Sequence, residues 1–245
     1  MKKERNGFIM QGEGSSIITS TREFAVAVDA SVLFANATPD DIRKLCDMVQ
    51  KWGFNVCVNS VYVQFASELL KALGVSVELA ATVGFPFGAS STAAKVAEAK
   101  LAVNQGATEV DMVLSIGQLR GGQHQAVQDD IQAVASVVHD NGGKALKVII
   151  ETCYLTDEEK IIACHLLTEA GADFIKTSTG YGTAGAAVKD IRLFRNHVGP
   201  QVKVKAAGGI RTLEQSMALM EAGACRLGIG AGHAEKIIKE WGAAH

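Results

Sequence analysis

The sequence lacks the features that mark several common classes of protein. It has 24 lysines and arginines against 26 acidic residues, so there is no basic surplus of the kind that nucleic-acid-binding proteins carry. No apolar run reaches the length of a membrane span. The first residues, MKKERNGFIMQGEGSS, are charged and polar, which argues against a secretory signal. We therefore expect a cytoplasmic protein that binds neither nucleic acid nor membrane.

The thiols and imidazoles also lack a recognisable arrangement. The five cysteines contain no CxxC pair and follow no pairing rule: Cys46, Cys57, Cys153, Cys164 and Cys225. An odd number without such a pair predicts reduced thiols in the cytoplasm. The six histidines form no HxH or HExxH motif. We therefore expect no metal site and no cofactor.

What the chain does have is an alternation of short β-branched runs with longer segments of helical period. Between the runs, apolar residues recur at the spacing of an amphipathic helix, as in Ile42, Leu45, Cys46 and Val49. Such a succession over a chain of this length predicts an α/β fold, a single (β/α)8 TIM barrel, with a doubly wound open sheet as the alternative. The runs that indicate strands are 24–29, 55–58, 75–82, 109–114, 146–151, 174–177, 202–206 and 226–229.

Residues that favour helix boundaries support this division. Thr38, followed by Pro39 and two acids, predicts the start of one helix. The sequences TDEE at Thr156 and TLEQ at Thr212 are typical of capping boxes. No segment has the composition of an interdomain linker. We expect a polar N-terminal extension over residues 1–20 and one catalytic barrel domain over residues 21–245.

A lysine inside the buried run 174–177 is the first sign of chemistry, since lysine is seldom buried without a partner. The segments GATEVD and GADFIK share a register that gives Asp111 and Lys176 corresponding positions in two strands. The run VKVK places Lys205 in the neighbouring strand. Because two like charges disfavour double protonation, one lysine should be a neutral amine able to attack a carbonyl, with Asp111 moving protons. A lysine that snorkels from a sheet edge is the alternative.

Glycine-rich turns follow the last three predicted strands, in STGYGTAG, AAGGIRT and GIGAGH. In such barrels the loops after strands seven and eight form phosphate sites, with amides at helix N-termini as donors. Plain tight turns are the alternative, and GIGAGH does not fit the dinucleotide motif GxGxxG. We expect substrate to be bound here by Thr177, Gly180, Gly208, Gly209, Gly230 and Ala231.

Six segments between Asp29 and about Gly232 resemble deoxyribose-phosphate aldolases, in order: CVNSVYV, VGFPFG, GATEVDMVLSIGQLRGG, LKVIIETCYLTDEEK, GADFIKTSTGYG and VKAAGGIRT. The resemblance implies a class I aldolase, a lyase without metal. It implies reversible cleavage of 2-deoxy-D-ribose 5-phosphate into acetaldehyde and D-glyceraldehyde 3-phosphate. Lys176 would form the Schiff base, Lys205 would lower its pKa, and Asp111 would relay protons.

The same resemblance has two departures. The family's Asp-His-Thr and following lysine stand here as Asp29-Ala30-Ser31 and Phe34, and its late serine pair matches Gly230 and Ala231. The catalytic set is intact, whereas the phosphate end has lost hydroxyl groups. One alternative is therefore a Schiff-base aldolase for an unphosphorylated or different deoxy sugar. The other is a sugar-phosphate-binding barrel without turnover.

Some further expectations concern single residues and assembly. Asp29 and Cys57 match pocket-lining positions of the family, although Cys57 also fits a small buried apolar position. Glu151, at the end of the fifth predicted strand, is either catalytic or an ion-pair partner of the catalytic residues. The expected partners are small-molecule aldehydes and sugar phosphates, and a second copy of the chain in a homo-oligomer, with a dimer favoured.

Overall fold

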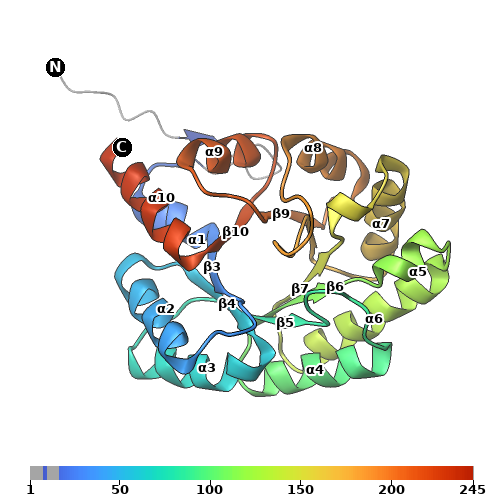
Figure 1. The fold of residues 1–245 in the computed structure, drawn as a ribbon, viewed down its shortest axis with the longest axis horizontal. Helices are drawn as coiled ribbons and strands as arrows, with labels where there is room; N and C mark the ends of the chain where they lie inside the picture. The colour runs from blue at the N-terminus through green and yellow to red at the C-terminus, as the bar shows by residue number, and fades with distance from the viewer. Residues whose placement is uncertain (1–7, 10–16, 245) are drawn as a thin grey trace.

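The computed structural model describes residues 8–9 and 17–244 of the chain. Its central feature is a closed barrel of eight parallel strands in the order β10-β3-β4-β5-β6-β7-β8-β9, with helices around the outside (Figure 1). The predicted TIM barrel is confirmed, and the open sheet is not formed. The strands are β3 (Val28–Val32), β4 (Asn55–Asn59), β5 (Leu79–Val83), β6 (Glu109–Val113), β7 (Ala145–Ile149), β8 (Phe174–Lys176), β9 (Lys203–Ala207) and β10 (Arg226–Gly230).

Each barrel strand leads into at least one helix, as the sequence pattern predicts. Two short 3-10 turns, η1 (Ser60–Tyr62) and η2 (Thr152–Tyr154), precede α3 and α7. The helices after the strands are α2 (Pro39–Trp52), α3 (Val63–Ala72), α4 (Thr92–Asn104), α5 (Ile116–Arg120), α6 (His124–Asp140), α7 (Asp157–Glu169), α8 (Val188–His197), α9 (Leu213–Glu221) and α10 (Ala231–Ala244).

Short elements precede the barrel among the described N-terminal residues. A small antiparallel pair, β1 (Phe8–Ile9) with β2 (Ile17–Ile18), precedes the barrel, and Ile18 is buried in the core. Within the predicted extension, residues 1–7 and 10–16 lie outside the described residues. The predicted strand 24–29 is wrong in its first half, because Thr21–Val26 forms helix α1. The Ser20 hydroxyl accepts from the Glu23 amide and the Glu23 carboxylate accepts from the Ser20 amide, a capping box that favours helix over strand.

The other helix starts follow the predicted caps, with one instructive exception. Thr38 and Thr156 each accept a hydrogen bond from the amide three residues on, and each forms a complete capping box. Thr212 accepts from the amide of Gln215, but the Gln215 side-chain oxygen accepts from the amide of Arg211 instead of Thr212. The predicted box at Thr212 is therefore half formed. Its second bond fixes the backbone of Arg211 against the start of α9.

The core is divided between an apolar shell and a charged barrel axis. On β6, Val110 and Met112 are fully buried in the hydrophobic cluster that the helices cover. The alternate residues Glu109 and Asp111 point the other way and contact Lys147, which β7 contributes to the barrel interior. Since strand side chains alternate between faces, one strand supplies both layers. Catalytic groups in this fold lie at the C-terminal ends of the strands.

Candidate active site

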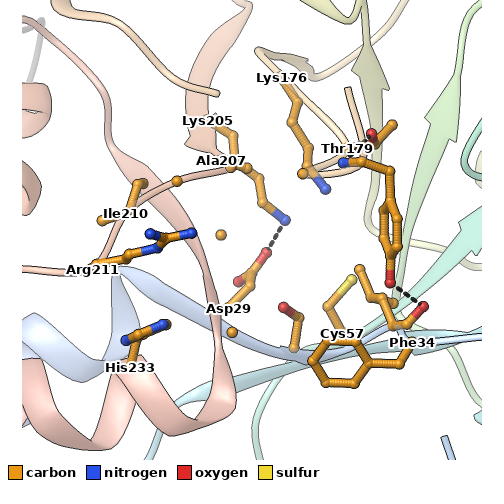
Figure 2. A pocket seen from close by; sticks show the side chains of 18 residues that line it. Asp29, Phe34, Cys57, Lys176, Thr179, Lys205, Ala207, Ile210, Arg211 and His233 are labelled. Carbon is orange, nitrogen blue, oxygen red and sulfur yellow. Dashed lines mark hydrogen bonds and ion pairs between the residues drawn. The ribbon is translucent and has the colours of Figure 1, made fainter. Parts of the chain in front are cut away.

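A cavity of about 300 Å³ opens at the C-terminal ends of β3, β8, β9 and β10. Its lining includes the side chains of Lys176 and Lys205, together with Asp29 and Cys57 (Figure 2). The volume lies at the lower end of the range of small-molecule pockets. The cavity can therefore hold a small substrate in contact with both lysines.

The two lysines meet at a single carboxylate oxygen. Lys176 Nζ donates to Asp111 Oδ2 over 2.6 Å, and Lys205 Nζ donates to the same oxygen over 2.7 Å. Neighbouring strands bring them together, since Lys176 of β8 pairs in register with Lys205 of β9. All three residues are buried, and Asp111 lies beneath the lysines rather than in the cavity lining. The alternative, a lysine that snorkels from a sheet edge, does not occur, because Lys176 is buried.

The environment separates the pKa values of the two lysines. Burial lowers the pKa of Lys176, and the charge of Lys205 lowers it further against the opposing pull of Asp111. Burial also disfavours the charged form of Lys205, but the carboxylates of Asp111 and Asp29 outweigh it and raise the pKa of Lys205. Lys176 is thus the amine that loses its proton first, while Lys205 holds a positive charge beside it. This is the division needed for one nucleophile and one proton donor.

A deeper ion-pair layer supports this pair, and sequence reasoning missed it. Lys147 Nζ lies 2.8 Å from Asp111 Oδ1, 2.5 Å from Glu109 Oε2 and 3.6 Å from Asp29 Oδ2. Arg226 Nη1 lies 2.7 Å from Asp29 Oδ1 and 3.6 Å from Glu109 Oε2. The signal was present in the apolar run LKVII, where a lysine interrupts a buried strand as Lys176 does in FIK.

The charges along the barrel axis balance only when one lysine is neutral. The cationic groups are Lys147, Lys176, Lys205 and Arg226, and the carboxylates are Asp29, Glu109 and Asp111. Burial would raise the pKa of both aspartates, but the surrounding cations hold each pKa well below its ordinary value. Asp29 and Asp111 therefore count as negative, and Glu109 forms an ion pair with Lys147. An uncompensated buried charge is strongly unfavourable. Neutral Lys176 leaves three charges of each sign.

Glu151 holds the loop that forms one wall of the cavity. It is the one described non-glycine residue with a positive φ, at 53°, and it is buried. Its carboxylate accepts from the amide of Thr179 over 3.3 Å and from the Thr179 hydroxyl. Burial raises the pKa of Glu151 despite these bonds. Since Thr179, Gly180 and Tyr181 line the cavity, Glu151 anchors the loop that carries them.

A second bond ties this loop across the cavity mouth. The Tyr181 hydroxyl donates to the carbonyl of Leu33, over 2.8 Å, in the loop after β3. The Tyr181 ring also meets Phe85 edge to face, with centroids 5.6 Å apart. Loops that are 148 residues apart in the chain are thereby joined beside Lys176.

The predicted binding residues fall into two groups. Asp29, Cys57, Gly180, Gly208, Gly209 and Gly230 line the cavity. Thr177 does not, because its hydroxyl donates to the carbonyl of Ala207 and accepts from the Ala207 amide, which ties β8 to β9. Ala231 lines a neighbouring hollow with Phe34 instead. Cys57 lies with its sulfur 3.9 Å from Asp111, and burial raises the pKa of its thiol to about 11, so it contributes a neutral wall.

Arg211 and His233 also line the cavity. They lie in the glycine-rich segments AAGGIRT and GIGAGH, but neither was among the predicted binding residues. Arg211 follows the Gly208–Gly209 turn after β9, and His233 lies in the first turn of α10. In Figure 2 both side chains extend into the cavity from the side opposite Phe34 and Cys57.

The described residues contain no group of three or more histidine, cysteine or acidic side chains arranged to hold a metal ion. The three axial carboxylates are engaged by lysine and arginine instead. The thiols of all five cysteines are free. None of the helices in the described part of the chain combines the length and apolar character needed to cross a membrane.

Comparison with known proteins points in one direction. Residues 23–235 match the model of the DeoC/LacD family aldolases. The chain is 52% identical over 212 residues to a deoxyribose-phosphate aldolase of Thermococcus kodakarensis, which covers 86% of this chain and 94% of the relative. It is 50% identical over 217 residues to the enzyme of that name from Carboxydothermus hydrogenoformans, covering 88% of this chain and 94% of the relative.

A solved structure of an aldolase superposes closely on the fold of this chain. The structure described as "Unique tetrameric structure of deoxyribose phosphate aldolase from Aeropyrum pernix" superposes with a TM-score of 0.84 at 28% identity. The superposition covers 92% of this chain and 94% of the other.

Proposed function

The chain belongs to the DeoC/LacD family of aldolases and is a lyase of the deoxyribose-phosphate aldolase type, and we propose that it works through a Schiff base on Lys176. The reaction is the reversible cleavage of 2-deoxy-D-ribose 5-phosphate into acetaldehyde and D-glyceraldehyde 3-phosphate. One observation carries the proposed mechanism: the amine of Lys176 lies in the cavity, on the same carboxylate oxygen as Lys205.

The first half of the reaction needs a nucleophile and a proton donor. The neutral amine of Lys176 adds to the aldehyde carbon of the open-chain sugar, and the carbinolamine loses water to give a protonated imine. Asp111 contacts both lysines and is therefore in reach of the two protons that move. One leaves the nitrogen of Lys176, and the other departs with the water. Lys205, which is protonated while Lys176 is neutral, is the donor for the departing water.

The second half breaks the carbon–carbon bond. Lys205, left neutral after it protonates the departing water, accepts the proton of the 3-hydroxyl. The electron pair of that O–H bond forms a new carbonyl, and the bond between C2 and C3 breaks. The electrons of that bond move into the iminium and form an enamine, releasing glyceraldehyde 3-phosphate. Protonation of the enamine carbon and addition of water then release acetaldehyde and restore the amine. The Lys205–Asp111 pair is the proton source that we propose for the enamine carbon.

The buried ion-pair layer has a positioning role in this proposal. Lys147 and Arg226 neutralise Asp29, Glu109 and the far oxygen of Asp111. Asp111 therefore keeps one oxygen for the two catalytic lysines. This arrangement holds the relay in place and keeps its carboxylate ionised.

The proposal also covers the oligomeric state and the cellular compartment of the protein. A homo-oligomer, with the dimer as its first stage, is supported by large apolar side chains on the surface: Val61 is 77% exposed and Phe87 is 76% exposed. The Aeropyrum pernix relative is described as a tetramer, and tetramers are commonly dimers of dimers. The five free thiols suit a reducing cytoplasm.

A retro-aldol assay tests the function. Purified protein should release acetaldehyde from 2-deoxyribose 5-phosphate, followed by coupling to alcohol dehydrogenase and NADH. Lys176→Met, which keeps the length of the side chain, should abolish release. Faster release from unphosphorylated 2-deoxyribose would favour the aldolase of a different sugar, and binding without any release would favour the non-catalytic barrel.

A further inference from the structure

A lysine and a glutamate form an ion pair below the cavity, outside its lining. Lys147 is fully buried in β7, and Glu109 is 4% exposed in β6. Lys147 Nζ lies 2.5 Å from Glu109 Oε2, and the cavity is lined by other residues. Taking two charges out of water is costly, and apolar residues in place of such a pair often leave stability unchanged or higher. Stability alone therefore gives little reason for a buried pair at this position.

Lys147 reaches the proposed nucleophile through Asp111. Its ammonium lies 2.8 Å from Asp111 Oδ1, whereas the amine of Lys176 lies 2.6 Å from Asp111 Oδ2. The register of the sheet fixes this arrangement, since Asp111 pairs with Lys147 across β6 and β7, and Ile149 of β7 pairs with Lys176 of β8. The two nitrogens are about 7 Å apart across one carboxylate, a distance at which a buried charge shifts a titration by about one to two pH units.

The charges around Lys176 decide where a proton goes when one of them is removed. The ionisable groups that face Lys176 and Asp111 are Asp29, Cys57, Glu109, Lys147, Lys205 and Arg226 from the strands, and Glu151 from the loop after β7. The Cys57 thiol is neutral, because burial raises its pKa to about 11. Without the charge of Lys147 the carboxylates are in excess. Lys176 then takes up the proton, since a neutral amine binds a proton more strongly than a carboxylate does.

We propose that Lys147 and Glu109 are a positioning pair that sets the protonation state of Lys176, and with it the pH range in which the enzyme works. This rests on the proposed function of Lys176 as the nucleophile. Lys147 is the member in contact with Asp111, so its charge acts at the shorter range and favours the neutral amine. Glu109 contacts Lys147 and opposes this effect from one step further away. The two members of the pair therefore shift the nucleophile in opposite directions.

Paired substitutions test this directly. Lys147→Met should move the acidic limb of kcat/KM for 2-deoxyribose 5-phosphate about one to two pH units higher, a loss of about tenfold to a hundredfold at neutral pH. Glu109→Gln should move the limb to lower pH. The double variant should have its limb close to that of the wild type, because both charges are gone. The KM measured above the limb should change little in all three, since neither residue lines the cavity.

Lys95→Met is the matched control. Lys95 is also fully buried, and its ammonium lies 2.6 Å from a carboxylate oxygen of Asp130, between α4 and α6 in the outer layer. The substitution breaks a buried ion pair and should lower the free energy of unfolding, but it should leave the acidic limb in place. A limb that moves in Lys95→Met as it does in Lys147→Met would be a general effect of lost stability and would overturn the proposal.

The titration of Lys176 can also be followed without turnover. Formaldehyde and cyanoborohydride methylate a neutral amine, and mass spectrometry of the peptides gives the rate at Lys176 for each pH. The titration should move to higher pH in Lys147→Met and to lower pH in Glu109→Gln, and the second variant carries the test alone if the first does not fold. If the titration in Glu109→Gln coincides with that of the wild type, the proposal is refuted. Shifts as described in a protein that releases no acetaldehyde would instead overturn the aldolase proposal and leave the role of the pair standing.

Discussion

Replacing Lys205 with leucine removes the positive charge next to the proposed nucleophile. Lys176 and Lys205 lie 2.6 and 2.7 Å from the same oxygen of Asp111, so their nitrogens are at most about 5.3 Å apart. Two like charges at that distance repel by about 3 kcal/mol at an effective dielectric constant of about 20. Lys205 therefore favours the neutral form of Lys176 by about a hundredfold. The pKa of Lys176 should rise in Lys205→Leu, since that charge is one of the causes that lower it.

The assay is the pH dependence of kcat/KM for the retro-aldol reaction. The rate rises with pH as Lys176 loses its proton, and this acidic limb should move to higher pH in Lys205→Leu. At neutral pH the variant should lose about a hundredfold in rate from this effect alone, with partial recovery in alkali. Loss of the proton donor alone would lower kcat/KM at every pH without moving the acidic limb. The position of the limb therefore separates a change in the pKa of Lys176 from the loss of the proton donor.

Lys203→Ala provides the control for this experiment. Lys203 lies two residues earlier on β9, on the same side of the strand, but it is exposed and its ammonium lies over the ring of Phe174. Its removal should leave the acidic limb where it is. If Lys205→Leu and the wild type share the same acidic limb, the two lysines are not coupled and the reasoning fails.

Two further variants test the cavity walls. Glu151→Ala removes the carboxylate that holds Thr179, so the free energy of unfolding should fall by about 2 kcal/mol in denaturant melts. The kcat/KM should fall about tenfold for the phosphorylated and the unphosphorylated sugar alike. A change confined to the phosphorylated sugar would contradict the anchoring role. Gly230→Ser should lower the KM for the phosphate ester about tenfold, because the added hydroxyl supplies one hydrogen bond to a charged group. Serine fits at this position, since Gly230 does not have a positive φ and an added Cβ meets no atom within 4 Å. An unchanged KM would mean that position 230 does not face the phosphate.

The barrel could be predicted because its signals are local. Helical spacing in segments such as 42–49, and threonine caps such as Thr156, depend on residues within a few positions of one another. The main error, helix α1 in place of the first half of strand 24–29, came from a capping box between Ser20 and Glu23 that lies just before the apolar run. The predicted strand 75–82 was also too long, since β5 begins at Leu79.

The candidate site could be predicted in part. Lys176, Lys205 and Asp111 stood out because a charged residue in an apolar strand run is unusual, and the structure brings them to one oxygen. The partners of Lys147 come from β3 and β6, so no sequence spacing connects them. Arg211 and His233 could not be predicted for another reason. Polar residues after glycine turns are common, and only the closed barrel brings these two to one cavity.

The central claim is that Lys176 is the nucleophile, and chemical trapping tests it most directly. The protein is incubated with acetaldehyde and reduced with borohydride, and its peptides are mapped by mass spectrometry, with a sample lacking borohydride as the control. Our account predicts a stable two-carbon adduct on Lys176 and on no other buried lysine, because burial and the charge of Lys205 lower its pKa and make it the amine that loses its proton most readily. An adduct on Lys147 or Lys205 in place of Lys176, or no adduct in a protein that still cleaves the sugar, would contradict it.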